Sequence, residues 1–191
     1  RRYDPTFVPA HDDSVVVLTT HNYKAEKINN DALNKLQTED FIFKGTITDA
    51  FNEKVLPVDM DLRLKKGAQV MFIRNDKGDD RRYFNGKIGV ISDIRKDYIS
   101  VSCSDDEDAI ELQKETWDNI KYVYNADKDM LEEEVLGSYS QYPLRLAWAI
   151  TIHKSQGLTF EKAIIDTVDS FSPGQVYVAL SRLTGLDGLI L

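Results

Sequence analysis

The sequence predicts an α/β protein in which a parallel β-sheet flanked by helices is interrupted by a small antiparallel β-barrel. Three observations predict it. A β-branched run precedes an amphipathic helix near the start, short strand-like runs fill the middle, and strand–helix alternation returns after Tyr142-Pro143. We therefore expect residues 62–140 to be an insertion in one discontinuous domain formed by 1–61 and 141–191, with 1–14 as a lead-in.

The first strand and helix follow directly from the pattern of apolar residues. Residues 15–20 form a continuous, mostly β-branched run, which is typical of a strand buried on both faces. Apolar residues then recur at helical spacing at Ala25, Ile28, Ala32, Leu33 and Leu36. A buried strand that leads into an amphipathic helix is half of a βαβ unit, which indicates a parallel sheet.

The middle region changes from helical to strand-like periodicity. Short strands are predicted at 41–43, 62–64, 69–73, 87–91 and 98–101, with turns such as Lys66-Gly67 and Asn85-Gly86 between them. Several short strands at regular spacing are typical of a small antiparallel barrel.

The last fifty residues return to α/β character. The pattern predicts a helix from Thr151 to Gln156 that ends at Gly157, and a strand at 163–165. A second helix is predicted near 173–183, because Ser172 is a good N-cap and Pro173 suits the first turn. A final strand is predicted at 189–191.

The total charge alone argues against a nucleic-acid-binding protein. The chain of 191 residues has a formal net charge of -8 at pH 7. However, residues 62–98 carry 10 basic and 5 acidic side chains (+5), whereas residues 99–140 carry 3 and 12 (-9). A local basic patch can bind phosphate in an acidic protein, because screening limits distant charges to about 8 Å. The alternative is that both runs are solvated turn residues.

The cysteine content and hydropathy indicate an intracellular protein, cytoplasmic if bacterial. Cys103 is the single cysteine, so no intrachain disulfide can form, and no Cys/His cluster has the spacing of a zinc site. No apolar run approaches the ~20 residues that span a bilayer. The first residue is Arg1 rather than Met, so we expect either a piece of a longer protein or a processed protein.

Two places have the side chains expected of a ligand site. Residues 151–159 combine hydroxyl, imidazole, ammonium and amide groups around a glycine, which suits an anionic ligand. A hydrolase that uses Ser155 and His153 is disfavoured, because residues two apart on a helix do not face each other. Arg182 follows the second predicted helix and offers a planar donor fork to phosphate oxygens, or a surface ion pair as the alternative.

Both places belong to longer stretches that resemble known motifs. Residues 143–160 and 175–183 resemble motifs V and VI of the Pif-like and RecD-like superfamily 1 DNA helicases. Residues 18–22 with Ile28-Asn29 resemble motif IV. Residues 64–75 with 85–91 resemble the SH3-like barrel that these helicases insert into their second RecA-like domain. The resemblance therefore implies the C-terminal half of such a helicase.

The resemblance implies an ATP-dependent, 5′→3′ DNA helicase with ATP and Mg²⁺ as cofactors. Single-stranded DNA or a single/double-strand junction and an N-terminal RecA-like domain of the same polypeptide are the implied partners, with no membrane. Arg182 would act as an arginine finger supplied in cis, and Gln156 and Gly157 would lie near the nucleotide. The implied DNA-binding residues are Thr20, Asn22, Thr151, His153 and Lys154, with Lys65, Lys66 and Lys87 on the barrel.

The 191 residues contain no Gly-x-x-x-x-Gly-Lys-Ser/Thr phosphate loop and no strand that ends in a paired acid for Mg²⁺. The resemblance assigns those elements to the N-terminal half, so the chain alone is expected to be inactive. The alternative is a non-catalytic protein- or DNA-binding module, a degenerate or regulatory relative of a helicase.

Overall fold

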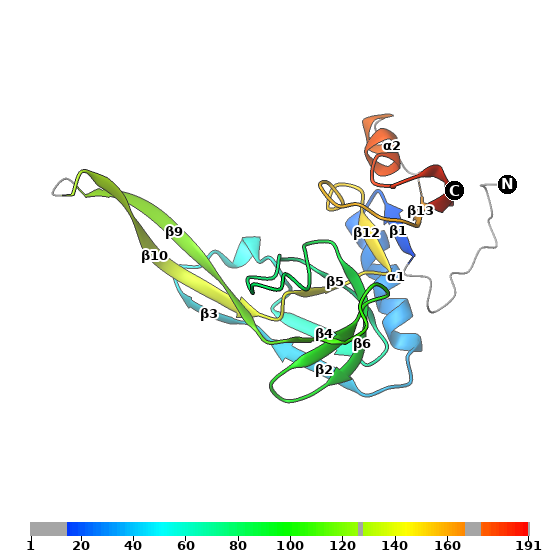
Figure 1. Cartoon of the computed structure of the whole chain (residues 1–191), viewed down its shortest axis with the longest axis horizontal. Helices are drawn as coiled ribbons and strands as arrows, with labels where there is room; N and C mark the ends of the chain where they lie inside the picture. Colours follow the sequence, from blue (N-terminus) through cyan, green and yellow to red (C-terminus); the bar gives the residue numbers. More distant parts are fainter. Residues whose placement is uncertain (1–14, 126–127, 167–172, 191) are drawn as a thin grey trace.

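A four-stranded parallel sheet contains strands from the two ends of the chain (Figure 1). The computed structural model describes residues 15–125, 128–166 and 173–190. The strand order is β12 (Ala149–Thr151), β1 (Val16–Thr19), β13 (Ala163–Ile165) and β14 (Leu189–Ile190), and every pair is parallel. The predicted first strand, the strand at 163–165 and the parallel sheet are confirmed. Residue 191 of the predicted last strand lies outside the described residues.

Two helices accompany this sheet. Helix α1 (Asn22–Lys35) follows β1 and contacts β1 and β12, burying Ala25 and Leu33 as its apolar spacing predicts. Helix α2 (Pro173–Leu180) ends three residues before the predicted limit, and the predicted cap Ser172 lies outside the described residues. Short 3₁₀ turns occur at η1 (Glu53–Val55) and η2 (Leu186–Gly188). Neither α1 nor α2 is long and apolar enough to cross a membrane.

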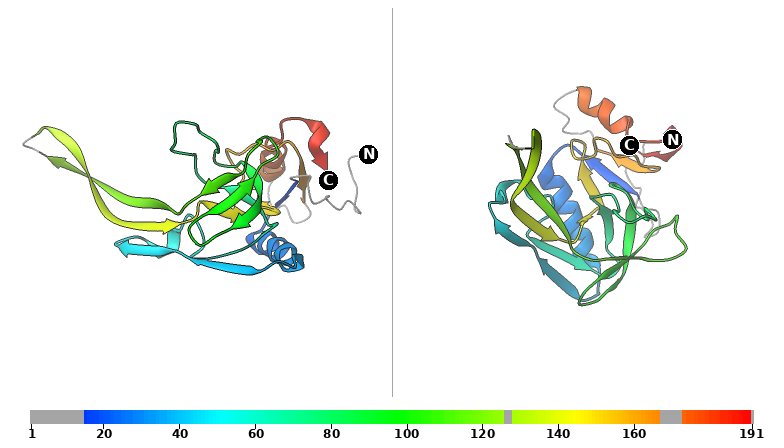
Figure 2. Two further views of the ribbon diagram at one scale, coloured as in Figure 1. Left: turned by 60° about the horizontal axis from the view of Figure 1, so that its bottom comes forward. Right: turned by 60° about the vertical axis from the view of Figure 1, so that its left-hand side comes forward.

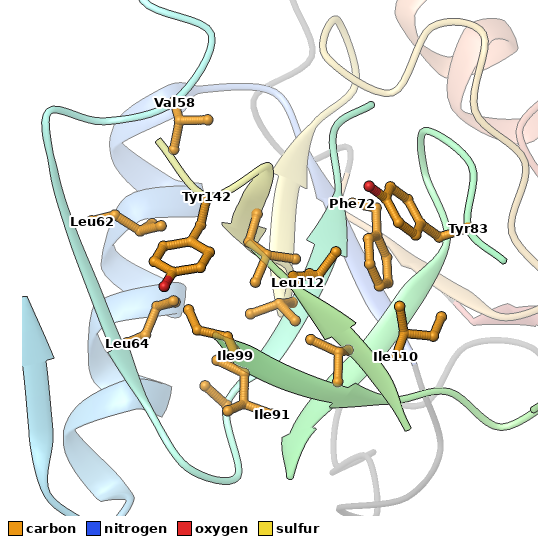
Figure 3. Close-up of a cluster of buried hydrophobic side chains, with 14 of the residues drawn as sticks. Val58, Leu62, Leu64, Phe72, Tyr83, Ile91, Ile99, Ile110, Leu112 and Tyr142 are labelled. Atoms are coloured by element: carbon orange, nitrogen blue, oxygen red, sulfur yellow. The ribbon is translucent and has the colours of Figure 1, made fainter. Parts of the chain in front are cut away.

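The middle of the chain is antiparallel, as predicted. A five-stranded sheet has the order β11 (Leu144–Leu146), β5 (Gln69–Phe72), β6 (Ile88–Ile94), β7 (Ile99–Ser102) and β8 (Ile110–Leu112). Beside it, β2 (Asp40–Lys44) pairs with β4 (Asp61–Lys65). Figure 3 shows the side chains of these strands packed into one cluster, which includes Leu64, Phe72 and Ile99.

A long hairpin was not predicted. Strands β9 (Glu115–Asn125) and β10 (Met130–Gln141) pair along their whole length, and β3 (Thr46–Asp49) pairs with the root of β10. The hairpin projects away from the rest of the structure in Figure 1 and in the left-hand view of Figure 2.

The antiparallel strands fall into three separate sheets, so the SH3-like barrel stays a prediction. The predicted division at residues 61 and 62 is also untested. Strands β2 and β3 precede that division, yet they pair with β4 and β10 of the predicted insertion.

Candidate functional site

The predicted DNA-binding residues other than the three lysines assigned to the barrel lie at the carboxyl edge of the parallel sheet. Strands β1 and β12 are neighbours, and Thr19 is in register with Thr151 at the point where both strands end. Thr20 and Asn22 follow β1, while His153 and Lys154 follow β12. Ligands of open α/β sheets bind at this edge, so the topology brings together residues more than a hundred positions apart.

The segment after β12 is a turn, and the predicted helix at 151–156 is wrong. Thr151 still belongs to β12, and the amide of Ile152 donates to the carbonyl of Thr19 at 2.8 Å. Residues 152–157 then form turns that end at Gly157, whose φ is +81°. The physical reason is that long-range pairing with β1 holds Thr151 extended, which leaves too few residues for an α-helix.

The same turn rules out Ser155 as an exposed nucleophile. Its side chain is fully buried, and its Oγ donates to the carbonyl of Ile152 at 2.7 Å. His153 is exposed, so the two side chains are not arranged as a catalytic pair. The structure therefore argues against a hydrolase that uses Ser155 as the nucleophile and His153 as its base.

A polar cavity of about 320 Å³ lies beside the carboxyl edge, between α1, β4 and the segment 145–154. It brings together the predicted residues Asn22, Thr151 and Lys154. Its charged lining also includes three carboxylates and two arginines that we did not predict: Glu26, Asp59, Asp61, Arg63 and Arg145.

The two arginines of this cavity are held by other groups. Arg145 Nη2 donates to the carbonyl of Pro57 at 2.6 Å. Arg63 Nε lies 2.9 Å from both carboxylate oxygens of Asp40, and this hydrogen bond holds the pKa of Asp40 below its ordinary value. Lys154 is exposed and forms no ion pair within the described part of the chain. Lys154 is therefore the cation most available to an anionic ligand.

Asn29 of α1 fixes the edge strand β12. Its Nδ2 donates to the carbonyl of Ala149, and its Oδ1 accepts from the amide of Ala149, both at 2.8 Å. The side-chain amide thus takes the place of a neighbouring strand. We missed this role, although the sequence carried a signal: Asn29 is a polar residue on the helix stripe between the buried residues Ala25 and Leu33.

The three predicted nucleotide-binding residues lie near one another. Arg182 follows α2, and its Nη1 donates to the carbonyl of Leu158 at 3.3 Å. Leu158 directly follows Gln156 and Gly157, both exposed, and a β-carbon at Gly157 would meet no atom within 4 Å. Two further bonds connect these segments, because Phe160 donates to the carbonyl of Arg182 and accepts from the amide of Thr184.

The guanidinium of Arg182 contacts neutral acceptors. Its Nε donates to the carbonyl of Val178 at 3.3 Å, and its Nη2 contacts Ser181 Oγ at 3.0 Å. Within the described residues no carboxylate pairs with it. Since carbonyl oxygens carry only partial charge, the positive charge remains available to a phosphate.

The three lysines that were predicted to bind DNA from the barrel do not form one exposed patch. Lys65 is buried, and its Nζ donates to the carbonyl of Leu36 at 2.9 Å. Lys87 is also largely buried and pairs with Asp106 at 2.7 Å. Lys66 is the exposed member, 4.0 Å from Asp93. The expected surface is therefore wrong for Lys65 and Lys87, because remote partners bind both ammonium groups.

The described residues do not gather ligands for a divalent metal ion. Among residues 15–125, 128–166 and 173–190, no three His, Cys, Asp or Glu side chains lie close enough together to hold a metal ion.

Comparison with known proteins gives a consistent set of relatives. The sequence is 34% identical over 188 residues to the ATP-dependent DNA helicase Pif1 of Campylobacter jejuni, covering 91% of this chain and 41% of that protein. The structure matches Pif1 from Bacteroides sp in complex with ADP-AlF4, with 39% identity, a TM-score of 0.89, and coverage of 99% of this chain and 42% of that one. It matches Bacteroides Pif1 bound to ssDNA with a TM-score of 0.74 over the same shares of both chains. No protein-family profile matches the sequence. The chain thus spans less than half the length of these relatives.

Proposed function

Because the chain belongs to the Pif1 family of superfamily 1 helicases, we propose that it forms the C-terminal part of an ATP-dependent DNA helicase. In this proposal residues 18–29, 143–160 and 175–183 act as motifs IV, V and VI. The antiparallel region acts as the SH3-like insert of the second RecA-like domain. The partner domain, which carries the phosphate loop, lies elsewhere in the same polypeptide.

The turn at residues 152–157 carries this proposal. The turn follows Thr151 and contains Lys154, and both residues line the polar cavity with Asn22. On the other side it leads through Gly157 to Leu158, whose carbonyl accepts from Arg182. Only a few residues therefore separate the proposed nucleotide site from the proposed DNA site. A structural change at a bound nucleotide can reach the DNA-binding residues through this turn.

The residues present suit the phosphates of ATP. Arg182 offers a guanidinium without a carboxylate partner in the described structure, and the open backbone at Gly157 leaves room for a ligand. ATP supplies the phosphoryl group whose hydrolysis drives movement along DNA. Arg182 stabilises the charge that develops on that group, a role worth about 10³–10⁵ in rate. No carboxylate cluster for Mg²⁺ exists in the described residues, so we assign its ligands to the partner domain.

The proposed DNA-binding residues include few charged side chains. In this proposal Thr20, Asn22 and Thr151 donate hydrogen bonds to phosphate oxygens of the DNA. His153 faces the DNA backbone, and Lys154 supplies a full positive charge. Such contacts position a strand without reading its sequence. Movement in the 5′→3′ direction is part of the proposal, and oligonucleotides with a 5′ or a 3′ overhang distinguish the two polarities.

Substituting Arg182 in the full-length protein tests the nucleotide side. Arg182→Ala should lower DNA-stimulated ATP hydrolysis at least about 10³-fold while single-stranded DNA affinity stays within about twofold. Arg182→Lys keeps the charge but loses the fork, so it should restore little activity. If Arg182→Ala hydrolysed ATP normally but lost DNA affinity, the assignment of Arg182 to the nucleotide site would be wrong.

Substituting Lys154 tests the DNA side. Lys154→Ala should weaken single-stranded DNA binding. It should also make the binding constant less dependent on salt concentration, by the amount expected for the loss of about one phosphate contact. Lys35→Ala is the matched control, because Lys35 is an exposed lysine of α1 at the end remote from Asn22. Equal effects of the two variants would contradict the assignment of Lys154 to DNA binding.

The 191-residue chain alone should not hydrolyse ATP, because the proposal places the phosphate loop in the partner domain. DNA-stimulated ATP hydrolysis by the pure chain would overturn this assignment.

A further inference from the structure

The hairpin of β9 and β10 has a free outer part. At its root, Tyr139 and Trp117 face each other with ring centroids 5.9 Å apart, and Asn119 Nδ2 donates to the carbonyl of Ala50 at 2.8 Å. Gly137 is packed against the backbone of Ala50 and Phe51, where a β-carbon would approach to 2.6 Å. Beyond this anchor, residues 120–125 and 128–135 project from the structure (Figure 1). The five steps from Ile120 to Asn125 of β9, at ~3.4 Å each, give this outer part a length of about 17 Å.

The two faces of this outer part, which we call the arm, differ in composition. Residues directly opposite on paired antiparallel strands share a face, and the side alternates along each strand. The pairs Ile120–Val135, Tyr122–Glu133 and Tyr124–Leu131 lie on one face. The pairs Lys121–Glu134, Val123–Glu132 and Asn125–Met130 lie on the other. Five of the six side chains on the first face are therefore apolar or aromatic.

These apolar side chains are exposed to solvent. The exposed fraction is 62% for Tyr122, 59% for Tyr124, 64% for Leu131 and 58% for Val135. A two-stranded ribbon is marginally stable by itself, and a contiguous exposed apolar stripe marks an interaction site. Tyrosine is enriched in such sites because its ring is rigid and amphipathic.

The charge of the arm selects among possible partners. Residues 120–135 contain five acidic and two basic side chains, a net charge of -3. Glu133 lies within the apolar face, and Glu132 and Glu134 lie behind it. Phosphate backbones are repelled by such a surface, and a second copy of the arm would bring the same negative charges into contact.

We propose that the apolar face of the arm is a docking surface for a protein segment that presents apolar side chains around an arginine or lysine. The apolar side chains pack against Tyr122, Leu131 and Val135. The cation pairs with Glu133 and lies against the tyrosine rings, a geometry that favours both ion pairing and cation–π contact. This surface is separate from the carboxyl edge of the parallel sheet, so the inference does not depend on the proposed function.

Two synthetic peptides and the 191-residue chain test the proposal. Both peptides have the same leucine positions, and one carries arginine where the other carries glutamate. Fluorescence anisotropy should detect binding of the arginine peptide and none of the glutamate peptide. Tyr122→Ser with Leu131→Ser should weaken binding by roughly tenfold or more, as expected for interface anchors. Glu133→Lys should produce a comparable loss.

The opposite face provides the matched control. Val123→Ser with Met130→Ser also removes two exposed apolar side chains, and it should change the affinity by less than about twofold. Circular dichroism and the thermal midpoint establish that each variant is folded. Equal losses from the two double variants, or equal binding of the two peptides, would overturn the proposal. So would a dimer that Tyr122→Ser with Leu131→Ser dissociates, or protection of the arm by a single-stranded oligonucleotide.

Discussion

Replacing Asn29 by alanine should destabilise the protein through the edge strand β12. The Asn29 side chain makes two hydrogen bonds of 2.8 Å with the backbone of Ala149, a residue only 1% exposed. Asn29→Ala leaves a buried N–H and a buried C=O without partners, at about 1–3 kcal/mol each. Part of this cost is offset by the higher helix propensity of alanine, about 0.6 kcal/mol. The expected loss is therefore about 1.5–5.5 kcal/mol.

The neighbouring asparagine isolates this effect. Asn30 lies on the same helix and is exposed, so Asn30→Ala gains the same propensity and loses no contact with Ala149. Urea unfolding should give a lower midpoint for Asn29→Ala than for Asn30→Ala. The thermal midpoint should fall by roughly 3–22 °C, at about 2–4 °C per kcal/mol for a chain of this size. If the two variants are equally stable, Asn29 does not hold β12.

Three further substitutions test other features. Gly86 and Gly157 both have positive φ, but a β-carbon at Gly86 would meet Leu158 Cδ2 at 2.8 Å, whereas one at Gly157 meets nothing within 4 Å. Gly157→Ala should cost about 1 kcal/mol of unfolding free energy from backbone strain, and Gly86→Ala clearly more, as measured by urea unfolding. Burial raises the pKa of Cys103 to about 12, so the folded state favours the neutral thiol. Its stabilising contribution is complete below the unfolded pKa near 9 and is lost as the pH rises toward 12. The free energy of unfolding should fall between pH 9 and 10, and Cys103→Ala should flatten this fall.

The apolar pattern of the sequence predicted those elements that are long enough to show a regular repeat or run of their own. The run at 15–20 predicted β1, because burial on both faces requires a continuous apolar run. The spacing of Ala25 and Leu33 predicted α1, because burial on one face leaves a helical repeat. Thr151 was placed in a helix because its partner, Thr19, is 132 residues away. A strand of three residues carries too little pattern of its own to reveal such a pairing.

The hairpin of β9 and β10 was not predicted because the side chains on both of its faces are exposed. Predictions from alternation assume that one face is buried, whereas Tyr122 and Val123 on adjacent positions of β9 are both exposed. The burial of Lys65 and Lys87 could not be predicted from local sequence either, because their partners Leu36 and Asp106 lie 29 and 19 residues away along the chain. Thr151, Lys154, Gly157 and Arg182 were named from the sequence because their motifs are contiguous, and the structure supplied the cavity and the Arg182–Leu158 contact that relate them.

The central position of β1 has a consequence for synthesis on the ribosome. Its two neighbours begin at Ala149 and Ala163, so β1 emerges more than 130 residues before either. At about 5–20 residues per second, it waits roughly 7–27 s for a partner. During that time most of the antiparallel strands are synthesised, while the apolar run at residues 15–18 stays uncovered. Nascent chains stalled between residues 125 and 145 should therefore be the most prone to aggregation and to bind chaperones, and this tendency should disappear once β12 and β13 have been translated and have left the ribosomal exit tunnel.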